Sequence, residues 1–289
     1  MGEQGCKADM GGDGAAVDTC GYPVETTGNA VLDILEHRSS TRAFARDDDG
    51  RPVAVTDGQR AAILHAASRA PSAGAMMMYS IVSIREQATL DRLVDLCDHQ
   101  PMIAKAPWAL IFVVDYAKWI DLFEHVGCFE PEFVERTGKS PRRAPGLGDF
   151  AIAAQDAVIA AQNAVVAAEA LGLGSCYIGD IIENAEEVAA LLDLPPYTMP
   201  LSMLIIGTPR KERPAIAHPV VNLVHEEHYR RADTATMDAQ VAEMDAMFRP
   251  HAREVGERVV DIYTRKHTSS FMAEMSRSME WWFKNWLGK

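Results

Sequence analysis

The stretch Asp149–Gly174, DFAIAAQDAVIAAQNAVVAAEALGLG, decides the fold, because it predicts one long and very apolar helix. Asp149 is a residue type that caps helix starts by accepting a backbone N–H bond, and Gly172 and Gly174 suit a helix end. No proline or glycine lies between Asp149 and Gly172. At about 1.5 Å per residue the helix is expected to span roughly 35 Å, and the rest of the chain to pack around it.

Most of the circumference of this helix is apolar. Its polar residues recur at seven-residue spacing, at Gln155, Gln162 and Glu169, with Asp156 and Asn163 beside the first two. A helix this apolar is buried in a large core or in an interface. A membrane span is the alternative, but polar side chains are costly in hydrocarbon. We therefore expect a helix in a core or a dimer interface, and no membrane partner.

The composition limits the class of protein. The chain has 289 residues, 48% of them hydrophobic, which is enough for one large core or two small domains. Its formal net charge of −13 argues against a nucleic-acid partner, because phosphate would be repelled. The five cysteines show no CxxC spacing, and the N-terminus lacks the apolar segment of a secretory signal. We expect reduced thiols in a cytoplasmic protein.

Helices and strands alternate along the chain, which predicts an α/β or α+β class. Residues 1–28 are rich in glycine, aspartate and alanine, and are expected to be a disordered lead-in. Residues 117–148 are aromatic, then rich in proline and glycine, and look like a lid or excursion. Helices are expected after Asn29, after Thr56, through Leu90–Leu96 and after Asn184, and strands at Tyr79–Ile84, Ala109–Val114, Ser175–Ile178 and Leu201–Ile206.

One helix start and one strand in this pattern can be predicted in more detail. Thr56 and Gln59 form a capping box at the start of their helix. The run Ala109–Val114 is continuously apolar, which predicts a sheet covered on both faces.

The last segment, residues 237–289, is expected to be a helical extension beyond a main domain at residues 29–236. Its apolar residues Phe271, Met275, Met279, Trp282 and Trp286 share one helical stripe. Such a stripe must dock on something, and the body of the protein or a partner subunit is favoured over a membrane, because no basic face accompanies it. Between a clasp on a second subunit and a docking surface for another protein, the clasp is favoured, since stable homodimers commonly bury large apolar surfaces.

The octamer HRSSTRAF, residues 37–44, is a candidate phosphate site. It offers two guanidinium groups, Arg38 and Arg42, and two hydroxyl groups, Ser39 and Ser40, just after a predicted helix. Arginine forks and hydroxyl groups suit a phosphate, whereas the alternative is a solvated basic loop.

The turn GTPRKERP, residues 207–214, is the second basic motif. It clusters Arg210, Lys211 and Arg213 after a predicted strand, where they would serve a phosphate or simply be solvated. His225 and His228 flank two glutamates, but this HEEH order is not the HExxH pattern and has no evident third ligand, so we expect no metal.

Two turns made of small residues are candidate ligand-binding elements. APSAGAMMMYS, residues 70–80, brings small residues to a turn before a strand, where backbone approaches a flat ligand closely. Its methionines Met76, Met77 and Met78 would line a pocket or fill the core. LGLGSCYIGDI, residues 171–181, surrounds a short strand with glycines but is not a GxGxxG dinucleotide motif. Cys176 within it is better explained as a small buried hydrophobe than as a nucleophile.

Taken in this order, the segments resemble the FMN-dependent nitroreductase family. The resemblance rests on the Arg-Ser-Ser-Thr-Arg opening, the Ala-Pro-Ser-Ala-Gly turn, the DAVIAAQNAVVAAEALGLGS helix and the last strand with its basic turn, and covers about residues 29–230. It implies an α+β, three-layer nitroreductase-like fold, in which helices flank a central, mostly antiparallel sheet. It also implies a homodimer with long central helices at the interface, and residues 29–236 as the FMN-binding domain.

The resemblance implies a role for each motif. Arg38 and Ser40, with Ser39 beside them, would hold the FMN phosphate, aided by one or more of the basic-turn cations. Arg42 would lie near the pyrimidine edge of the flavin, and the backbone around Gly179 and Asp180 near its N5 atom. The residues that would line the ring from the other subunit are Pro71, Ser72, Ala73, Gly74 and, at a position where many relatives have asparagine, Ala75. Met77, Met78 and Tyr79 replace a common Gln-Pro-Trp, which implies a more apolar floor.

The leading hypothesis is an FMN oxidoreductase with no catalytic side chain, because the flavin performs the hydride chemistry. NAD(P)H would reduce FMN, which would pass electrons to a nitro compound, a quinone or another small acceptor in a ping-pong cycle. A second hypothesis is a divergent FMN enzyme: a dehalogenase, an azoline dehydrogenase or a flavin-processing enzyme. A third is a non-catalytic flavin-binding protein.

Overall fold

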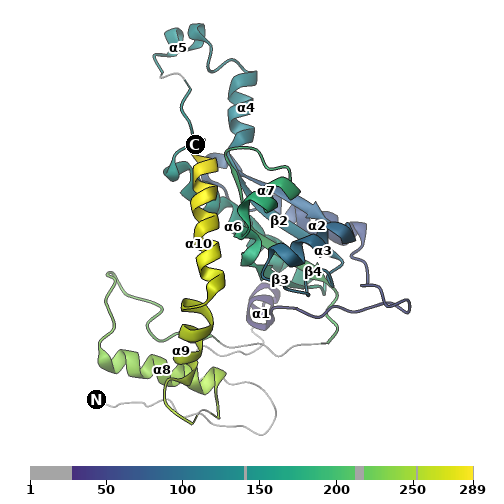
Figure 1. Ribbon diagram of the computed structural model, residues 1–289, viewed down its shortest axis with the longest axis vertical. Helices are drawn as coiled ribbons and strands as arrows, with labels where there is room; N and C mark the ends of the chain where they lie inside the picture. Colours follow the sequence, from purple (N-terminus) through teal and green to yellow (C-terminus); the bar gives the residue numbers. More distant parts are fainter. Residues whose placement is uncertain (1–27, 140–141, 212–217, 252, 289) are drawn as a thin grey trace. The chain divides into compact units, whose positions relative to one another are not determined.

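The computed structural model describes residues 28–288 except 140–141, 212–217 and 252. Contacts within the chain divide it into two compact units, Met1–Arg38 with Arg213–Met272, and Ser39–Glu212 with Ala273–Lys289. The second unit holds a sheet flanked by helices, which confirms the α+β class (Figure 1). The predicted boundaries at residues 28 and 236 stay predictions, and residues 1–27 and Arg213 lie outside the described residues.

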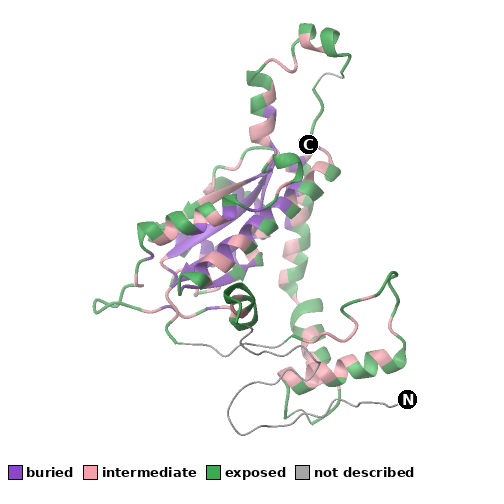
Figure 2. Cartoon of the chain, turned by 180° about the vertical axis from the view of Figure 1, so that it is seen from behind, coloured by how far each residue is buried: buried purple, intermediate pink, exposed green. Residues whose placement is uncertain are grey.

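The sheet has four antiparallel strands in the order β1-β2-β4-β3. These are β1 (Tyr79–Ile84), β2 (Trp108–Asp115), β3 (Gly174–Ile178) and β4 (Thr198–Gly207). Every residue of β2 is buried, as its apolar run predicts. Figure 2 shows the strands as the buried centre of this unit. Both faces of β2 are covered because helices pack on each side.

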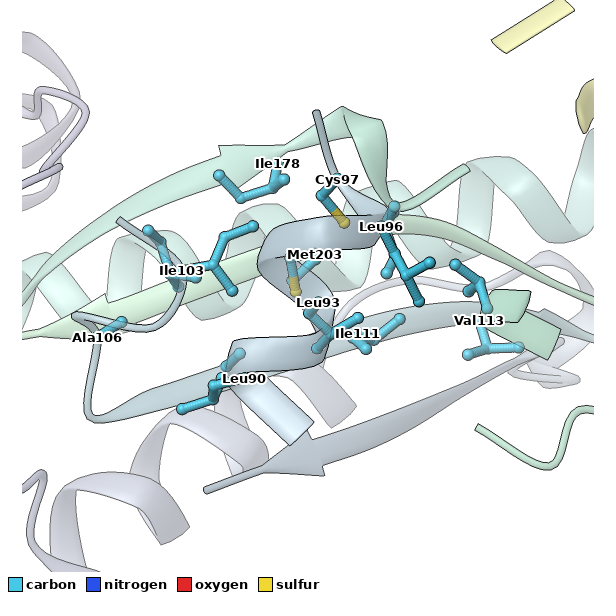
Figure 3. Packing of buried hydrophobic residues seen from close by; sticks show 14 of the residues in the cluster. Leu90, Leu93, Leu96, Cys97, Ile103, Ala106, Ile111, Val113, Ile178 and Met203 are labelled. Atoms are coloured by element: carbon cyan, nitrogen blue, oxygen red, sulfur yellow. The ribbon is translucent and has the colours of Figure 1, made fainter. Parts of the chain in front are cut away.

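One face of the sheet is covered by α3 (Gln87–Leu96), η2 (Gly179–Ile182), α7 (Ala185–Leu191) and the end of α10 (Ser270–Trp286). Leu90, Leu93 and Leu96 recur at helical spacing and point from α3 onto Ile111 and Val113 of β2 (Figure 3). The other face is covered by α2 (Asp57–Ser68) and α6 (Leu147–Ala170). The result is the three-layer arrangement expected from the resemblance.

The long helix α6 belongs to the core of this unit. Its alanines Ala157, Ala160, Ala161 and Ala164 are buried because a methyl group lets α2 and the strands approach closely. By length and composition α6 is the one helix among the described residues that is long and apolar enough to cross a membrane. Its packing on α2, β2 and β4 is that of a core helix.

The start of α6 differs from the expectation. Gly146, not Asp149, occupies the N-cap position, and the helix begins at Leu147. Asp149 still satisfies an N–H group at this end, because its carboxylate accepts a 2.8 Å bond from the Gly146 backbone and is held by Arg143. That ion pair lowers the pKa of Asp149.

Two shorter helices begin where their capping signals predict. Asn29 accepts from the backbone of Val31 and Leu32 at the start of α1 (Ala30–His37). Thr56 and Gln59 form the reciprocal capping box at the start of α2. After α2, the η1 turn (Ala73–Ala75) leads into β1.

The predicted excursion contains two helices, α4 (Ala117–His125) and α5 (Pro131–Thr137). The first unit contains α8 (Thr234–Phe248), α9 (Glu257–Ile262) and a π-helical turn, η3 (Tyr263–His267).

Trp282 and Trp286 of α10 have 0% exposed surface within this chain. These two side chains therefore dock on the body of the protein, one of the two expected sites, and the clasp of the tail on a second subunit stays a prediction.

Candidate functional site

The turn between α2 and β1 has an unusual backbone. Gly74, Ala75 and Met77 all adopt left-handed conformations, with φ of 58°, 55° and 48°. Glycine adopts this conformation freely, but each non-glycine residue in it costs about 1–2 kcal/mol. Backbone strain of this kind persists where surrounding contacts enforce it, and it concentrates at functional sites. The turn is therefore a candidate functional element.

Asp156 of α6 is the residue that enforces this turn. Its carboxylate is 3% exposed and accepts bonds from the Ser72 hydroxyl at 3.0 Å, the Ala73 backbone at 3.0 Å and the Met78 backbone at 3.3 Å. The Ser72 oxygen accepts in turn from the Met77 backbone at 2.6 Å. Charge-assisted bonds of this kind are stronger than neutral ones. Asp156 is not among the site residues predicted from the sequence, although a carboxylate within an otherwise apolar helix is a usable signal.

The turn is held from its other side as well. The Trp119 indole of α4 donates to the Met76 carbonyl at 2.9 Å. Met78 is buried in the core, Met76 is half-buried and Met77 is 43% exposed. The methionines were expected either to line a pocket or to fill the core. Met78 fills the core, whereas Met77 faces outward, where it could line a pocket.

The segment after Arg38 runs along the edge of the sheet. Ser40 bridges Ser175 of β3, and the Thr41 backbone donates to the Ser175 carbonyl at 2.8 Å. Gly174 is required here, because a β-carbon on it would lie 2.1 Å from Thr41 Oγ1. The glycine-rich stretch before β3 thus permits close packing of the serine-containing segment.

Cations from two predicted motifs meet at this edge. The Arg210 backbone donates to the Ala43 carbonyl at 3.0 Å, which places the basic turn after β4 beside Arg42. The side chains of Arg42, Arg210 and Lys211 are exposed, and Ser39 and Ser40 are half-exposed. This donor set of guanidinium, ammonium and hydroxyl groups suits a phosphate. Arg38 is the residue after α1 and belongs to the other compact unit, so its role at the phosphate stays a prediction.

The turn after β3 is the third predicted element. Gly179 is exposed, and a β-carbon on it would meet no atom within 4 Å among the described residues, so open space adjoins its backbone. The Asp180 carboxylate is held by the Gln100 amide at 2.5 Å. An open backbone beside an anchored side chain suits the close approach of a flat ligand.

Glu183, directly after this turn, is an unusual buried acid. It is 3% exposed, and its Oε1 atom has no hydrogen-bond partner among the described residues. Burial raises the pKa of Glu183 to about 7, and the charges of Asp180, Asp98 and Glu274 add to the rise. Glu183 is not among the residues predicted from the sequence, because nothing in its local pattern indicates burial.

Neither the buried cysteines nor the metal-ligating residue types in the described part of the chain suggest another kind of catalysis. Cys97 and Cys176 are buried, and burial raises the pKa of the Cys97 thiol, which makes it a poor nucleophile. No group of three or more metal-ligating side chains occurs in the part of the chain that the structure describes.

The excursion contains a cavity of about 530 Å³. Its lining is aromatic and aliphatic with two cations: Tyr116, Ile120, Phe123, Cys128, Phe129, Phe133, Lys139 and Arg143. Its size falls in the range of small-molecule sites. Trp119, one residue before Ile120, links this region to the strained turn through its bond to Met76.

Comparison with known proteins places this chain among flavin-dependent reductases. The model of the "Nitroreductase family" matches residues 35–208. The chain is 33% identical over 219 residues to the oxygen-insensitive NADPH nitroreductase of Salmonella typhimurium, covering 74% of this chain and 81% of that protein. It is 31% identical over 215 residues to the FMN reductase [NAD(P)H] of Bacillus subtilis, covering 73% and 79%. Among solved structures, NfrA2 of B. megaterium superposes with a TM-score of 0.67 at 26% identity, covering 86% of this chain and 97% of that one.

Proposed function

Because the chain belongs to the nitroreductase family, we propose that it is an FMN-dependent oxidoreductase that takes electrons from NADH or NADPH and passes them to a small acceptor. Relatives named FMN reductase and NADPH nitroreductase, each similar over most of its length, support this proposal. Bound FMN supplies the hydride chemistry, and the protein supplies binding, orientation and electrostatics. The observation that carries the proposal is the strained Ser72–Met77 turn held by Asp156, which lies inside the matched range.

The phosphate of FMN is assigned to the basic edge of the sheet. Ser39 and Ser40 would donate hydroxyl bonds, and the exposed cations Arg210 and Lys211 would supply positive charge. Arg38, adjacent to Ser39 in sequence, and Arg213, outside the described residues, complete the proposed set. Reduced flavin carries negative charge near its pyrimidine edge, where the guanidinium of Arg42 would stabilise it.

The ring is assigned to the two turns. Pro71, Ser72, Ala73, Gly74 and Ala75 would line it from a second subunit, with a backbone held rigid by Asp156. Gly179 and Asp180 would approach N5, since open space adjoins the Gly179 backbone. No side chain needs to act as nucleophile or base, because these residues only bind and orient.

A homodimer is part of the proposal. The outward face of α6 carries exposed apolar side chains, which water disfavours and a second copy would cover: Leu147, Ile152, Val158 and Ile159. Stable homodimers bury large apolar surfaces of this kind. A cytoplasmic location fits Cys97, Cys128 and Cys176, which form no disulfide bond among the described residues.

The acceptor is a nitro compound, a quinone or a similar small molecule in this proposal. Met76 and Met77 would form an apolar and adaptable floor, with Met78 supporting them from the core. The same methionines, with Ala75 where many relatives have asparagine, favour a divergent reaction such as dehalogenation as the second candidate. Turnover rates measured with a series of electron acceptors distinguish these two candidate reactions. Efficient reduction of simple nitroaromatics would contradict the divergent reaction.

The test is a visible absorption spectrum of the protein supplied with FMN, before and after anaerobic NAD(P)H. We expect a bound flavin spectrum that bleaches. Arg38→Ala combined with Arg42→Ala should weaken FMN binding about 100-fold, because the charge-assisted bonds of Arg38 to the phosphate and of Arg42 to the pyrimidine edge are lost. Arg51→Ala is the matched control, since Arg51 is an exposed arginine paired only with the exposed Asp49 among the described residues.

Each result of this test has a distinct meaning. Bound flavin that stays oxidised would favour a non-catalytic flavin-binding protein. Unchanged FMN affinity in the double variant would contradict the roles assigned to Arg38 and Arg42.

A further inference from the structure

The helix α7 begins without a cap of its own. Asn184, its N-cap residue, is left-handed with φ of 49°, and its side chain donates to the Leu96 carbonyl at 2.9 Å. The first N–H groups of a helix lack partners within the helix, and a side chain at the N-cap normally accepts from them. Here the acceptors come from α10. Glu274 accepts from the Asn184 backbone and Ser278 from the Ala185 backbone, each at 3.1 Å.

The tryptophan one turn further along α10 holds the turn that precedes α7. Trp282 is fully buried, and its indole donates to the carbonyl of Ile182 at 2.9 Å. Ile182 is the last residue of η2, the turn that Gly179 opens. The ring belongs to the same core cluster as Ile178 and Ile181, so both ends of this bond lie in one packed region.

The capping groups on α10 are themselves fixed. Glu274 accepts from the Ser278 hydroxyl at 2.8 Å and from Arg277 Nε at 2.9 Å. Bonding to Arg277 is the main cause that holds the pKa of Glu274 well below its usual range, so the carboxylate stays charged at neutral pH. Arg277 also makes two 2.8 Å bonds to Glu186 of α7. The end of α10 therefore forms a fixed frame around the residues from Ile182 to Glu186.

We propose that α10 is a positioning element for the Gly179–Ile182 turn, acting through Trp282, Glu274 and Ser278. The inference rests on the proposed function for its consequence, because that function places Gly179 and Asp180 at the reactive edge of the flavin. It also goes beyond the family, since α10 lies outside the matched residues 35–208. The last helix of the chain thus sets the geometry of a turn about 100 residues earlier.

The test compares two tryptophans on the same helix. Trp282→Phe removes the bond to Ile182, whereas Trp286→Phe makes the same chemical change one turn later and removes a 3.0 Å bond to the Gly146 carbonyl. Both residues are fully buried, so both variants should lose similar stability. Hydrogen exchange of the peptide covering residues 178–185 should become about tenfold faster in Trp282→Phe and stay unchanged in Trp286→Phe.

The flavin supplies a second readout. In Trp282→Phe, bleaching by saturating NAD(P)H should slow about tenfold with little change in FMN affinity, because the turn orients the ring and does not hold the phosphate. Trp286→Phe should bleach at the wild-type rate. Ser278→Ala removes one hydroxyl group and keeps the helix, so it serves as the second variant if Trp282→Phe does not fold.

The outcomes separate the two proposals. Equal exchange at residues 178–185 in both tryptophan variants would overturn the positioning role. Wild-type protein that binds no FMN, with faster exchange only in Trp282→Phe, would keep the positioning role and overturn the proposed function. Faster exchange with unchanged bleaching would overturn the link between α10 and the flavin.

Discussion

The two turns assigned to the flavin ring are supported in different ways. Three donors of the Ser72–Met78 turn depend on one buried carboxylate, Asp156, while the Trp119 indole holds the Met76 carbonyl on the other side. The Gly179–Ile182 turn is held by packing and a neutral indole bond from α10, and the capping bonds of α10 reach the residues just after it. The first support is charged and lies inside the family match, whereas the second lies outside it.

This difference predicts how substitutions would destabilise each turn. A single carboxylate that satisfies three donors leaves all of them unpaired when it is lost, and unpaired buried donors are costly. The Gly179–Ile182 turn and the residues after it are held by Trp282, Glu274 and Ser278 together. Substitution of any one of these residues removes only some of the stabilising bonds. We therefore expect the Ser72–Met78 turn to be sensitive to one substitution, and the Gly179–Ile182 turn to respond by degrees.

The largest expected effect comes from Asp156→Asn. An amide keeps one acceptor oxygen but turns N–H groups toward donors, so the bonds to Ser72, Ala73 and Met78 cannot all survive. We expect a loss of about 4 kcal/mol in the free energy of unfolding, measured by urea denaturation. FMN affinity, measured by titration, should fall as well, because the left-handed residues relax once the carboxylate is lost.

Asn163→Ala is the matched control on the same helix. Asn163 lies seven residues further along α6 and donates one 3.0 Å bond to the Ala66 carbonyl, away from the turn. Asn163→Ala should lower the free energy of unfolding by about 1 kcal/mol and leave FMN affinity unchanged. Equal effects of the two substitutions on FMN affinity would remove the special role of Asp156.

The next effect is a pH dependence that arises beside the second turn. The pKa of Glu183 is about 7 in the folded chain, above its ordinary value of 4.5, because of burial and the nearby Asp180, Asp98 and Glu274. Between these pH values the folded state binds more protons than the unfolded state, so this group destabilises the fold as pH rises from about 4.5 to about 7. The glutamine in Glu183→Gln cannot ionise, so this variant should not lose stability over this pH range.

Urea denaturation at two pH values measures the difference. At pH about 8 Glu183→Gln should be about 2 kcal/mol more stable than the wild type, and at pH about 4 the two should be nearly equal. A constant difference across this range would mean that Glu183 keeps an ordinary pKa.

The smallest effect concerns strain in the first turn. Ala75 is left-handed, and asparagine tolerates that conformation better than alanine does. Ala75→Asn should therefore stabilise the fold by about 0.5–1 kcal/mol in urea denaturation. Ala75→Val is the opposing control, because a β-branched residue is least tolerant of this conformation. Stabilisation by valine would contradict the left-handed assignment.

Much of the fold was predictable because its signals are local. The capping box at Thr56 and the start after Asn29 each depend on residues within one turn of helix. The strand Tyr79–Ile84 was predicted with the bounds that the structure has. The start of α6 was misplaced, because Asp149 bonds backwards to Gly146 instead of standing at the N-cap itself.

Part of the candidate site was also predictable, since Arg42, Arg210 and the two small-residue turns were identified as motifs. Their supports were not, because Asp156 lies 84 residues from Ser72, and Trp282 lies 100 residues from Ile182. The contacts on which the two tryptophans dock were not predictable for the same reason.

The sequence by itself determined the four strands, the helices α1, α2, α3, α6 and α7, the apolar nature of α6 and the residues able to bind a phosphate. Those properties follow from the local period of side chains and from the chemistry of each residue. The tertiary structure alone decided which donors Asp156 and Glu274 satisfy, which acid is buried at Glu183 and where the last helix docks. Hydrogen bonding and burial join residues that are distant along the chain, so only the folded arrangement reveals which partner each polar group has.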